Sequence, residues 1–389
     1  MRKCENWLDT YMLYTEQSEA PDNYHLWCGI SAIAAALRRQ VWIDMGHFDV
    51  YPNMYIVLVG PPATRKGAAI NIATRIMSKV GDIKVGSDAV TREALIQAIK
   101  QSENSSEMNG KIYLHSSLML VSKELSVFLG NNNFELLSLL TDLYDAHDRW
   151  VYRTKHEGTD ELNGVWLHLL AGTTPLWLTG SVPMNAIGGG FTSRVIFVVE
   201  HHKRKNTAIP ELTDDEISLR RDLQYDLEQI SMIKGKFSFS KEGKKWFKDW
   251  YDNKVDALSQ DPRFQGYADR KHIHLLKVAM AIAASFEDKL VLEAQHLQMA
   301  LQMLEQLEEN MTDAFGAVGR NILAPDIDTV LQYIQDNGKL SRDQLLRSVW
   351  RDVNTRDVEK VLSILQDMKL IRRTADGGII YYEMYKKEV

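Results

Sequence analysis

The residues with the clearest chemical meaning form one short segment, Gly60-Pro61-Pro62-Ala63-Thr64-Arg65-Lys66-Gly67. An apolar run, Met54–Val59, precedes it, and a helix-like stretch, Ala68–Val80, follows it. A buried strand, a loop of small residues and a helix are the setting of a Walker A motif, in which backbone N–H groups and the positive helix end surround phosphates. Lys66 stands where the phosphate-contacting lysine of that motif stands. We therefore expect residues 60–67 to bind ATP and Lys66 to take part in catalysis.

Two positions of this loop depart from the motif. Arg65 replaces the glycine before the lysine, and Gly67 replaces the serine or threonine whose hydroxyl holds magnesium. Mg²⁺ is still the expected cofactor, but the missing hydroxyl puts its binding and the hydrolysis rate in doubt. The alternative is a basic loop in an inactive relative.

Two later segments could complete the chemistry of phosphoryl transfer. The apolar run Leu118–Val121 leads to Glu124, as in a Walker B strand whose aspartate has become Ser122 or Lys123. A glutamate there can orient the attacking water, although it could equally cap a helix. Beyond the run Trp166–Leu170, Thr173 or Thr174 could sense the terminal phosphate or simply form the turn before Pro175; we select Thr174 as the catalytic candidate.

Two arginines are further candidates for contacts with the nucleotide. Arg194 follows the glycine-rich loop Gly188–Phe191, from which it could reach a phosphate in a neighbouring subunit, or it could pair locally with a carboxylate. Arg270 opens an apolar helix, His272–Ser285, and could lie over the nucleotide as a second sensor, or serve as a cap or surface partner.

The pattern of apolar residues predicts an α/β fold around these segments. Strands at Met54–Val59, Ile83–Val85, Leu118–Val121, Trp166–Leu170 and Val195–Val199 alternate with helices, which favours a parallel sheet covered on both faces. Residues 5–40 and 211–315 have helical periodicity. We expect an N-terminal helical segment (1–50), a P-loop core (51–205), a helical lid (206–323) and a C-terminal domain (324–389).

Composition limits the class of protein. The chain has 389 residues, of which 45% are hydrophobic and 25% charged, as in ordinary globular proteins. No apolar run approaches the ~20 residues of a membrane helix, and the first residues lack the apolar core of an export signal. The two cysteines are expected to be reduced. We expect a cytoplasmic protein with no membrane partner, and a net charge of −6 leaves room for a local nucleic-acid surface.

The last segment has the order of helices and strands that is typical of a small DNA-binding domain. Helices are predicted at Asp328–Asp336, Arg342–Trp350 and Arg356–Met368, and the strands Leu370–Thr374 and Ile379–Tyr382 flank a glycine turn. This order is similar to that of a winged helix-turn-helix domain. Eleven basic and eleven acidic residues make the segment neutral from residue 326 onward, so packing against protein is the alternative to DNA contact. The candidate DNA contacts are Arg356, Lys360, Arg372 and Arg373.

Taken in order, these motifs resemble a family of phage and mobile-element replication ATPases of the P-loop AAA+ type. The matching positions are Tyr51–Tyr55, Gly60–Lys66, Glu124, Ala171–Pro175 and Gly188–Arg194, and the resemblance covers about residues 5–290. It implies an ATP-driven translocase or helicase on DNA that works as a homo-oligomeric ring, such as a hexamer. It also implies that Arg65-Lys66 is a normal variant of the loop.

The resemblance gives a role to one more segment. In such rings a hairpin before the first sensor projects into the pore, and here Arg149–Lys155 and Leu162–Leu167 flank a turn. Arg153, Lys155 and His156 could then meet DNA phosphates, while Trp150 or Tyr152 stacks on bases. The alternative is a surface hairpin of mixed charge. The basic run His201–Lys205 is either a linker or part of a DNA path.

Two other functions remain open at this stage. The chain could be a nucleotide-dependent initiator or helicase loader that binds DNA through its winged helix. It could also be an inactive P-loop scaffold, which the missing hydroxyl at Gly67 favours.

Overall fold

The protein forms two compact units in a computed structural model, Met1–Phe315 and Gly316–Val389. The structure describes residues 2–86, 91–108, 110–130, 133–154, 158–181, 190–253, 258, 261, 263–314, 324–349, 353, 358–376 and 378–385. Each unit has a hydrophobic core of its own. The first unit contains the segments expected as N-terminal helices and P-loop core, and the expected lid (206–323) as far as Phe315.

The centre of the first unit is a five-stranded sheet with strand order β4-β5-β8-β3-β9. Four of its strands run parallel, and only β4 is antiparallel to its neighbour. The parallel strands are buried over long apolar runs, as strands covered on both faces must be. The bounds are β3 Tyr55–Val59, β4 Glu103–Met108, β5 Lys111–Ser122, β8 Val165–Thr173 and β9 Val195–Val199.

The α/β prediction with a largely parallel sheet is therefore confirmed. Four of the five predicted strands are present, with β5 and β8 longer than expected. The segment Ile83–Val85 contributes only one bridge, from Val85 to Met119 of β5. The hairpin β4–β5 extends the sheet with a polar strand that lacks the apolar pattern of the others.

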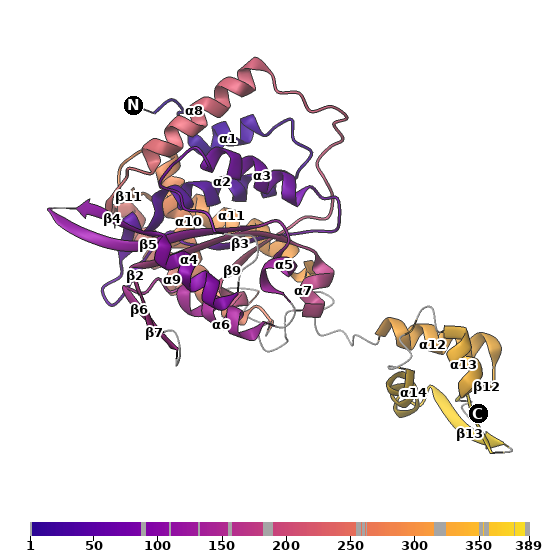
Figure 1. The fold of residues 1–389 in the computed structure, drawn as a ribbon. Helices are drawn as coiled ribbons and strands as arrows, with labels where there is room; N and C mark the ends of the chain where they lie inside the picture. The colour runs from indigo at the N-terminus through magenta and orange to yellow at the C-terminus, as the bar shows by residue number, and fades with distance from the viewer. Residues whose placement is uncertain are drawn as a thin grey trace. The chain divides into compact units, whose positions relative to one another are not determined.

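Helices cover both faces of this sheet, as Figure 1 shows. On one face lie α1 (Trp7–Tyr14), α2 (Asp22–Leu37) and α3 (Lys66–Met77), and α4 (Arg92–Gln101) and α6 (Phe134–Leu143) lie on the other. Helix α2 is buried on almost every side because it packs between the sheet and the helices α1, α3, α8 (Asp214–Ile230) and α10 (Gln265–Phe286). The short helices α5 (Leu125–Leu129) and α7 (Pro175–Ser181) follow the ends of β5 and β8.

A second, smaller sheet joins the N-terminal segment to the helical region. Its order is β11-β10-β1-β2, and Val41 of β1 pairs in parallel with Gly235 of β10. The sequence predicted helices for residues 211–315, and the short strands β10 and β11 are exceptions to that prediction. Strand β10 pairs with β1, almost two hundred residues away, and β11 pairs with β10, so a local pattern reveals neither strand. The strands are β1 Val41–Asp44, β2 Asp49–Val50, β10 Gly235–Phe239 and β11 Val291–Leu292.

Four long helices complete the first unit: α8 (Asp214–Ile230), α9 (Lys241–Asn253), α10 (Gln265–Phe286) and α11 (Ala294–Ala314). Helix α8 begins with a reciprocal capping box between Thr213 and Glu216. Helix α10 begins at Gln265, so Arg270 lies in its second turn and does not open the helix, as had been predicted. The buried residues Tyr267 and Ala268 extend the apolar face by another turn.

The described residues of the second unit form three helices and a three-stranded antiparallel sheet. The helices are α12 (Ala324–Asn337), α13 (Arg342–Val349) and α14 (Val358–Asp367), and the sheet order is β12-β14-β13. The predicted order of three helices followed by a hairpin is confirmed, and the hairpin strands are β13 (Ile371–Asp376) and β14 (Ile379–Met384). The short strand β12 (Leu340–Ser341) was not predicted.

Candidate functional site

The loop between β3 and α3 has the form that its sequence indicated. Tyr24 donates a hydrogen bond from its hydroxyl to the Val59 carbonyl at 2.6 Å, which fixes the end of β3. A Cβ on Gly60 would lie 2.6 Å from the Glu200 carbonyl oxygen, so only glycine fits there. The N-terminus of α3 has no side-chain cap, which leaves its first N–H groups and its dipole to an anion.

Lys66 is buried, and its ammonium points back into the loop. It donates hydrogen bonds to the carbonyl oxygens of Gly60 at 2.7 Å and Pro61 at 3.0 Å, and to the Thr64 hydroxyl at 3.3 Å. Burial lowers the pKa of Lys66, and the nearby Glu124 carboxylate opposes that shift. A cation held by neutral carbonyl groups and close to a carboxylate is ready to take a phosphate oxygen.

The backbone conformation at Arg65 explains why the Walker A motif has glycine at this position. Arg65 has a φ of 66° and Ala63 a φ of 68°, both in the left-handed region that favours glycine. The Arg65 guanidinium lies 2.7 Å from the Glu19 carboxylate, which Lys203 also contacts at 3.3 Å. The arginine is therefore turned toward the N-terminal segment.

The loop fits a phosphate better than it fits a metal ion. Gly67 provides no hydroxyl, and a Cβ added there would meet nothing within 4 Å. The Thr64 hydroxyl is committed to the Pro61 carbonyl at 2.9 Å. Among the described residues there is no group of three His, Cys, Asp or Glu side chains that could hold a metal. A nucleotide bound here would bring magnesium mainly through its own phosphates.

The structure brings the other core candidates to the same sheet edge as Lys66. The parallel register pairs Val59 with Thr173 and Ser122 with Ala171, so the carboxyl ends of β3, β5 and β8 meet. Glu124 is exposed at the start of α5, and its side chain makes no capping hydrogen bond. The expected alternative, a helix-capping glutamate, is therefore not what its side chain does.

The two threonines at the end of β8 differ. The Thr174 hydroxyl accepts a hydrogen bond from the Trp177 backbone N–H at 3.4 Å, which caps α7. The Thr173 hydroxyl is fully buried without a hydrogen-bond partner, and its carbonyl accepts the Gly60 N–H at 3.3 Å. Thr173 is thus better placed than Thr174 to respond to a ligand in the loop.

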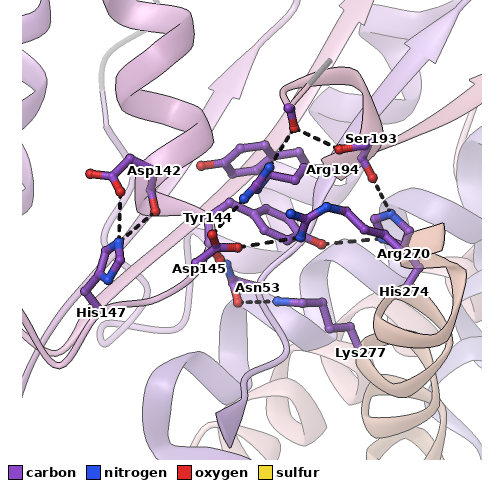
Figure 2. A network of polar contacts seen from close by, with 12 residues as sticks. Asn53, Asp142, Tyr144, Asp145, His147, Ser193, Arg194, Arg270, His274 and Lys277 are labelled. Carbon is purple, nitrogen blue, oxygen red and sulfur yellow. Dashed lines mark hydrogen bonds and ion pairs between the residues drawn. The ribbon is translucent and has the colours of Figure 1, made fainter. Parts of the chain in front are cut away.

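Arg194 and Arg270 lie at the opposite end of the parallel strands, where β3 and β9 begin. Val195 pairs with Tyr55 at the start of β3, whereas the loop with Lys66 follows the end of this five-residue strand, whose length is about 16 Å at roughly 3.3 Å per residue. Arg194 donates to Asp145 at 2.7 Å and to the Gly190 carbonyl at 2.8 Å, and Arg270 lies 3.8 Å from the same Asp145 (Figure 2). The local carboxylate partner named as the alternative for Arg194 is present. Arg270 does not lie over the phosphate loop of its own chain, because it shares Asp145 with Arg194.

The predicted DNA contacts in the first unit are described in part. The hairpin exists as β6 (Arg149–Thr154) and β7 (Gly158–Asn163), with Arg153 exposed, but Lys155 and His156 lie outside the described residues. Trp150 and Tyr152 stack on each other, and each also contacts the body of the unit: Trp150 donates to Asp142 at 2.6 Å, and Arg92 lies over the Tyr152 ring. Both rings therefore already contact other side chains of the first unit.

The basic run 201–205 contacts the N-terminal segment. Arg204 pairs with Asp22 and donates to the Thr15 carbonyl at 2.9 Å, and Lys205 donates to Gln17 at 2.8 Å. Its charges therefore hold the polypeptide around Glu19 in place. The prediction of a linker fits this position better than a DNA path.

In the second unit the basic candidates lie on the surface. Lys360 on α14 and Arg372 and Arg373 on β13 are exposed, and Arg372 donates to Glu383 on β14 at 3.0 Å. Arg356 lies outside the described residues.

Sequence reasoning missed the groups that surround these candidates, above all Glu19, Asp145 and Lys277. Lys277 did leave a signal, because it interrupts the apolar stretch of α10. No protein-family model matches this chain, and no curated protein matches it either. In the described part of the chain, every helix is too short or too polar to cross a membrane.

Proposed function

We propose that the chain is an ATP-driven DNA translocase or helicase with a P-loop core of the AAA+ type, acting in DNA replication as a homo-oligomeric ring. One observation carries the proposal: Lys66, Glu124 and Thr173 lie at one carboxyl edge of a parallel sheet, where β8 separates the strand of the loop from the strand of the glutamate. This is the arrangement that the resemblance to replication ATPases implies.

The residues have distinct tasks in this proposal. The uncapped start of α3 and the Lys66 ammonium bind the terminal phosphates of ATP, and Lys66 exchanges the Gly60 and Pro61 carbonyls for phosphate oxygens. Glu124 orients the attacking water. Mg²⁺, brought by the nucleotide, neutralises charge on the phosphates.

The position of Arg194 favours an active site shared between subunits. An arginine at the far edge of the sheet does not serve the loop of its own chain, but it can approach the loop of a neighbouring copy. Its side chain is 8% exposed and held by Asp145, so a phosphate must displace that carboxylate. Exchange of one anion for another costs little charge solvation compared with exposing a bare arginine.

DNA contact is supported by the exposed Arg153 on the β6–β7 hairpin and by Lys360, Arg372 and Arg373 of the second unit. The order of three helices and a hairpin is consistent with a winged helix. No membrane partner is part of the proposal.

A second candidate function has its own support. The missing hydroxyl at Gly67 and the Arg65–Glu19 pair favour a P-loop unit that binds nucleotide with little turnover, such as an initiator, a loader or a scaffold.

ATP hydrolysis measured with and without single-stranded DNA, beside a mass measurement of the assembly, separates these functions. A motor hydrolyses ATP faster with DNA and forms a ring. Slow turnover with duplex binding favours the initiator or loader, and absence of nucleotide binding removes the proposal.

A further inference from the structure

A cavity of about 720 Å³ lies in the first unit beside α10, at the sheet edge opposite the phosphate loop. Its walls come from residues 48–53, the segment after α6, the start of the 3₁₀ turn before β9, and α10. Figure 2 shows Asn53, Asp145, Arg270 and Lys277 converging here from these separate segments. The cavity is therefore distinct from the site around Lys66.

Two arginines share one carboxylate in this part of the molecule. Asp145 serves both Arg194 at 2.7 Å and Arg270 at 3.8 Å. Lys277 is 3% exposed. Its ammonium donates a hydrogen bond to Asn53 Oδ1 at 2.6 Å and lies 4.5 Å from the centre of the Tyr144 ring. Both of these partners are uncharged, and among the residues that the structure describes no carboxylate forms an ion pair with Lys277.

Two other acidic residues, Asp49 and Asp269, also line the cavity. Asp49 lines the cavity, but the charges that act on it are those of Asp44, Asp148, Arg39 and Lys236. Asp269 is exposed, and the His272 ring next to it contacts its backbone carbonyl at 3.0 Å. His274 faces Tyr144 and the Ser193 carbonyl. The charges that act on Lys277 are therefore those of Asp145, Arg194 and Arg270.

We propose that this cavity is a second oxyanion site, which takes a phosphate group between Arg270 at its side and Lys277 at its back. Arg270 is the accessible cation, with 35% of its side chain exposed, and Lys277 is the buried one. An arginine and a lysine around a cavity are a usual way to hold a phosphate.

The buried lysine couples this binding to protons. Burial, with a smaller effect of the Arg194 and Arg270 charges, lowers the pKa of Lys277 to about 7, and the Asp145 carboxylate opposes this shift. A dianion in the cavity favours the charged lysine and raises that pKa. Between pH 7 and 8 about half or more of the empty sites hold a neutral lysine, so binding should take up a fraction of a proton, approaching one at the upper end.

The phosphate group has two possible sources. It can be free in solution, or it can belong to a nucleotide held by the phosphate loop of a second copy. The second source rests on the proposed function, whereas the cavity itself does not.

The test uses the full chain and sulfate, a tetrahedral dianion that does not titrate near neutral pH. Titration calorimetry at pH 7.5 in two buffers of different ionisation enthalpy gives the number of protons taken up. We expect uptake by the unaltered protein and by Lys66→Ala, because the loop is not involved. Lys277→Gln keeps an N–H donor for Asn53 but cannot be protonated, so it should abolish the uptake and weaken sulfate about tenfold.

Lys289→Gln is the matched control, because Lys289 is exposed and pairs with Glu287 at 2.7 Å. It should behave as the unaltered protein. Absence of uptake in the unaltered protein, or unchanged uptake in Lys277→Gln, overturns the proposal, as does loss of uptake in Lys66→Ala. If Lys277→Gln does not fold, Arg270→Gln at the cavity side must weaken sulfate severalfold, and unchanged affinity there also overturns the proposal.

The same titration with the slowly hydrolysed analogue ATPγS separates the sources. If the phosphate comes from a neighbour's nucleotide, uptake requires Lys66 and rises with assembly at higher protein concentration. If it comes from solution, uptake is independent of both. A protein without ATPase activity that still binds sulfate through Lys277 would sink the proposed function and leave the oxyanion site intact.

Discussion

The Arg65 guanidinium lies 2.7 Å from the Glu19 carboxylate, so the loop between β3 and α3 is tied to the polypeptide between α1 and α2. Thr207 and Lys203 also contact Glu19, at 2.9 and 3.3 Å. One carboxylate therefore joins the loop, the N-terminal segment and the basic run after β9, and its pKa is lowered mainly by the Thr207 N–H.

The left-handed backbone conformation of Arg65 should cost stability, and two substitutions can measure this cost. Arg65→Ala and Arg65→Gly both remove the ion pair with Glu19, but only glycine accepts a φ of 66° without cost. We expect the free energy of unfolding, measured in urea, to be about 1 kcal/mol higher for the glycine variant than for the alanine variant. Equal stability of the two variants would show that the left-handed conformation is not retained in solution.

Gly67 and Gly60 should respond in opposite ways to a side chain. Gly67→Ser places its Cβ in open space and supplies the missing hydroxyl, so we expect a stable protein with tighter, magnesium-dependent ATP binding. Gly60→Ser drives its Cβ against the Glu200 carbonyl and the Tyr24 hydroxyl, so it should lower the unfolding temperature. Thermal unfolding and ATP titration with and without Mg²⁺ check both. No effect of Mg²⁺ on Gly67→Ser would mean that the loop holds the phosphates differently.

Lys66→Ala should lose ATP hydrolysis by two orders of magnitude or more, because it removes the charge that faces the terminal phosphates. Lys289→Gln, in an exposed position away from the loop, is the control. Steady-state ATPase assays measure the loss, and unchanged turnover in Lys66→Ala would rule out the nucleotide site.

Arg194→Ala should retain nucleotide binding while hydrolysis falls steeply, if Arg194 acts on a neighbouring subunit. Mixing it with Lys66→Ala should restore some activity, since a mixed ring contains interfaces in which an intact Lys66 meets an intact Arg194. Mass measurement must show that the two variants assemble together. Co-assembly without recovered turnover would assign Arg194 to its local pair with Asp145.

Stability should depend on pH through the buried His168. Its Nδ1 accepts the Met54 N–H at 3.1 Å, its Nε2 lies 2.7 Å from the Ser31 hydroxyl, and burial lowers its pKa to about 3. The unfolded chain therefore binds one more proton than the folded chain between about pH 3 and 6.5, so stability falls as the pH falls through this range. The slope reaches about 1.4 kcal/mol per pH unit for one such group.

His168→Gln cannot take up that proton, so the pH dependence of its urea unfolding between pH 6.5 and 4 should be shallower. His25, whose pKa burial also lowers to about 3, remains in this variant and accounts for part of the residual slope. An unchanged slope would assign the acid sensitivity to other groups.

DNA binding by the second unit should show in the salt dependence of affinity. Replacing Lys360 and Arg373 together by glutamine in the full chain should lower the salt slope by roughly two units, one for each lost phosphate contact. Fluorescence anisotropy with duplex and single-stranded DNA measures the slope. The same slope in the double variant would indicate that this unit contacts protein instead.

The sequence by itself determined the local elements. The buried runs before Gly60, Glu124 and Thr173 predicted three parallel strands, because continuous apolar residues suit a sheet covered on both faces. The loop and its two departures from the motif could be read directly, and so could the helices and hairpin of the second unit. These features depend on neighbours within a few residues, and their pattern therefore survives in the sequence.

Only the tertiary structure decided which side chains meet. The parallel register of β3 and β9 separates Lys66 from Arg194 by the length of a strand, although both flank the same sheet. Asp145, Arg270 and Lys277 converge from α6, α10 and their flanking segments, and no spacing in the sequence identifies Asp145 as their shared carboxylate. Ion pairs and burial depend on distances across the fold, which the order of residues along the chain does not contain.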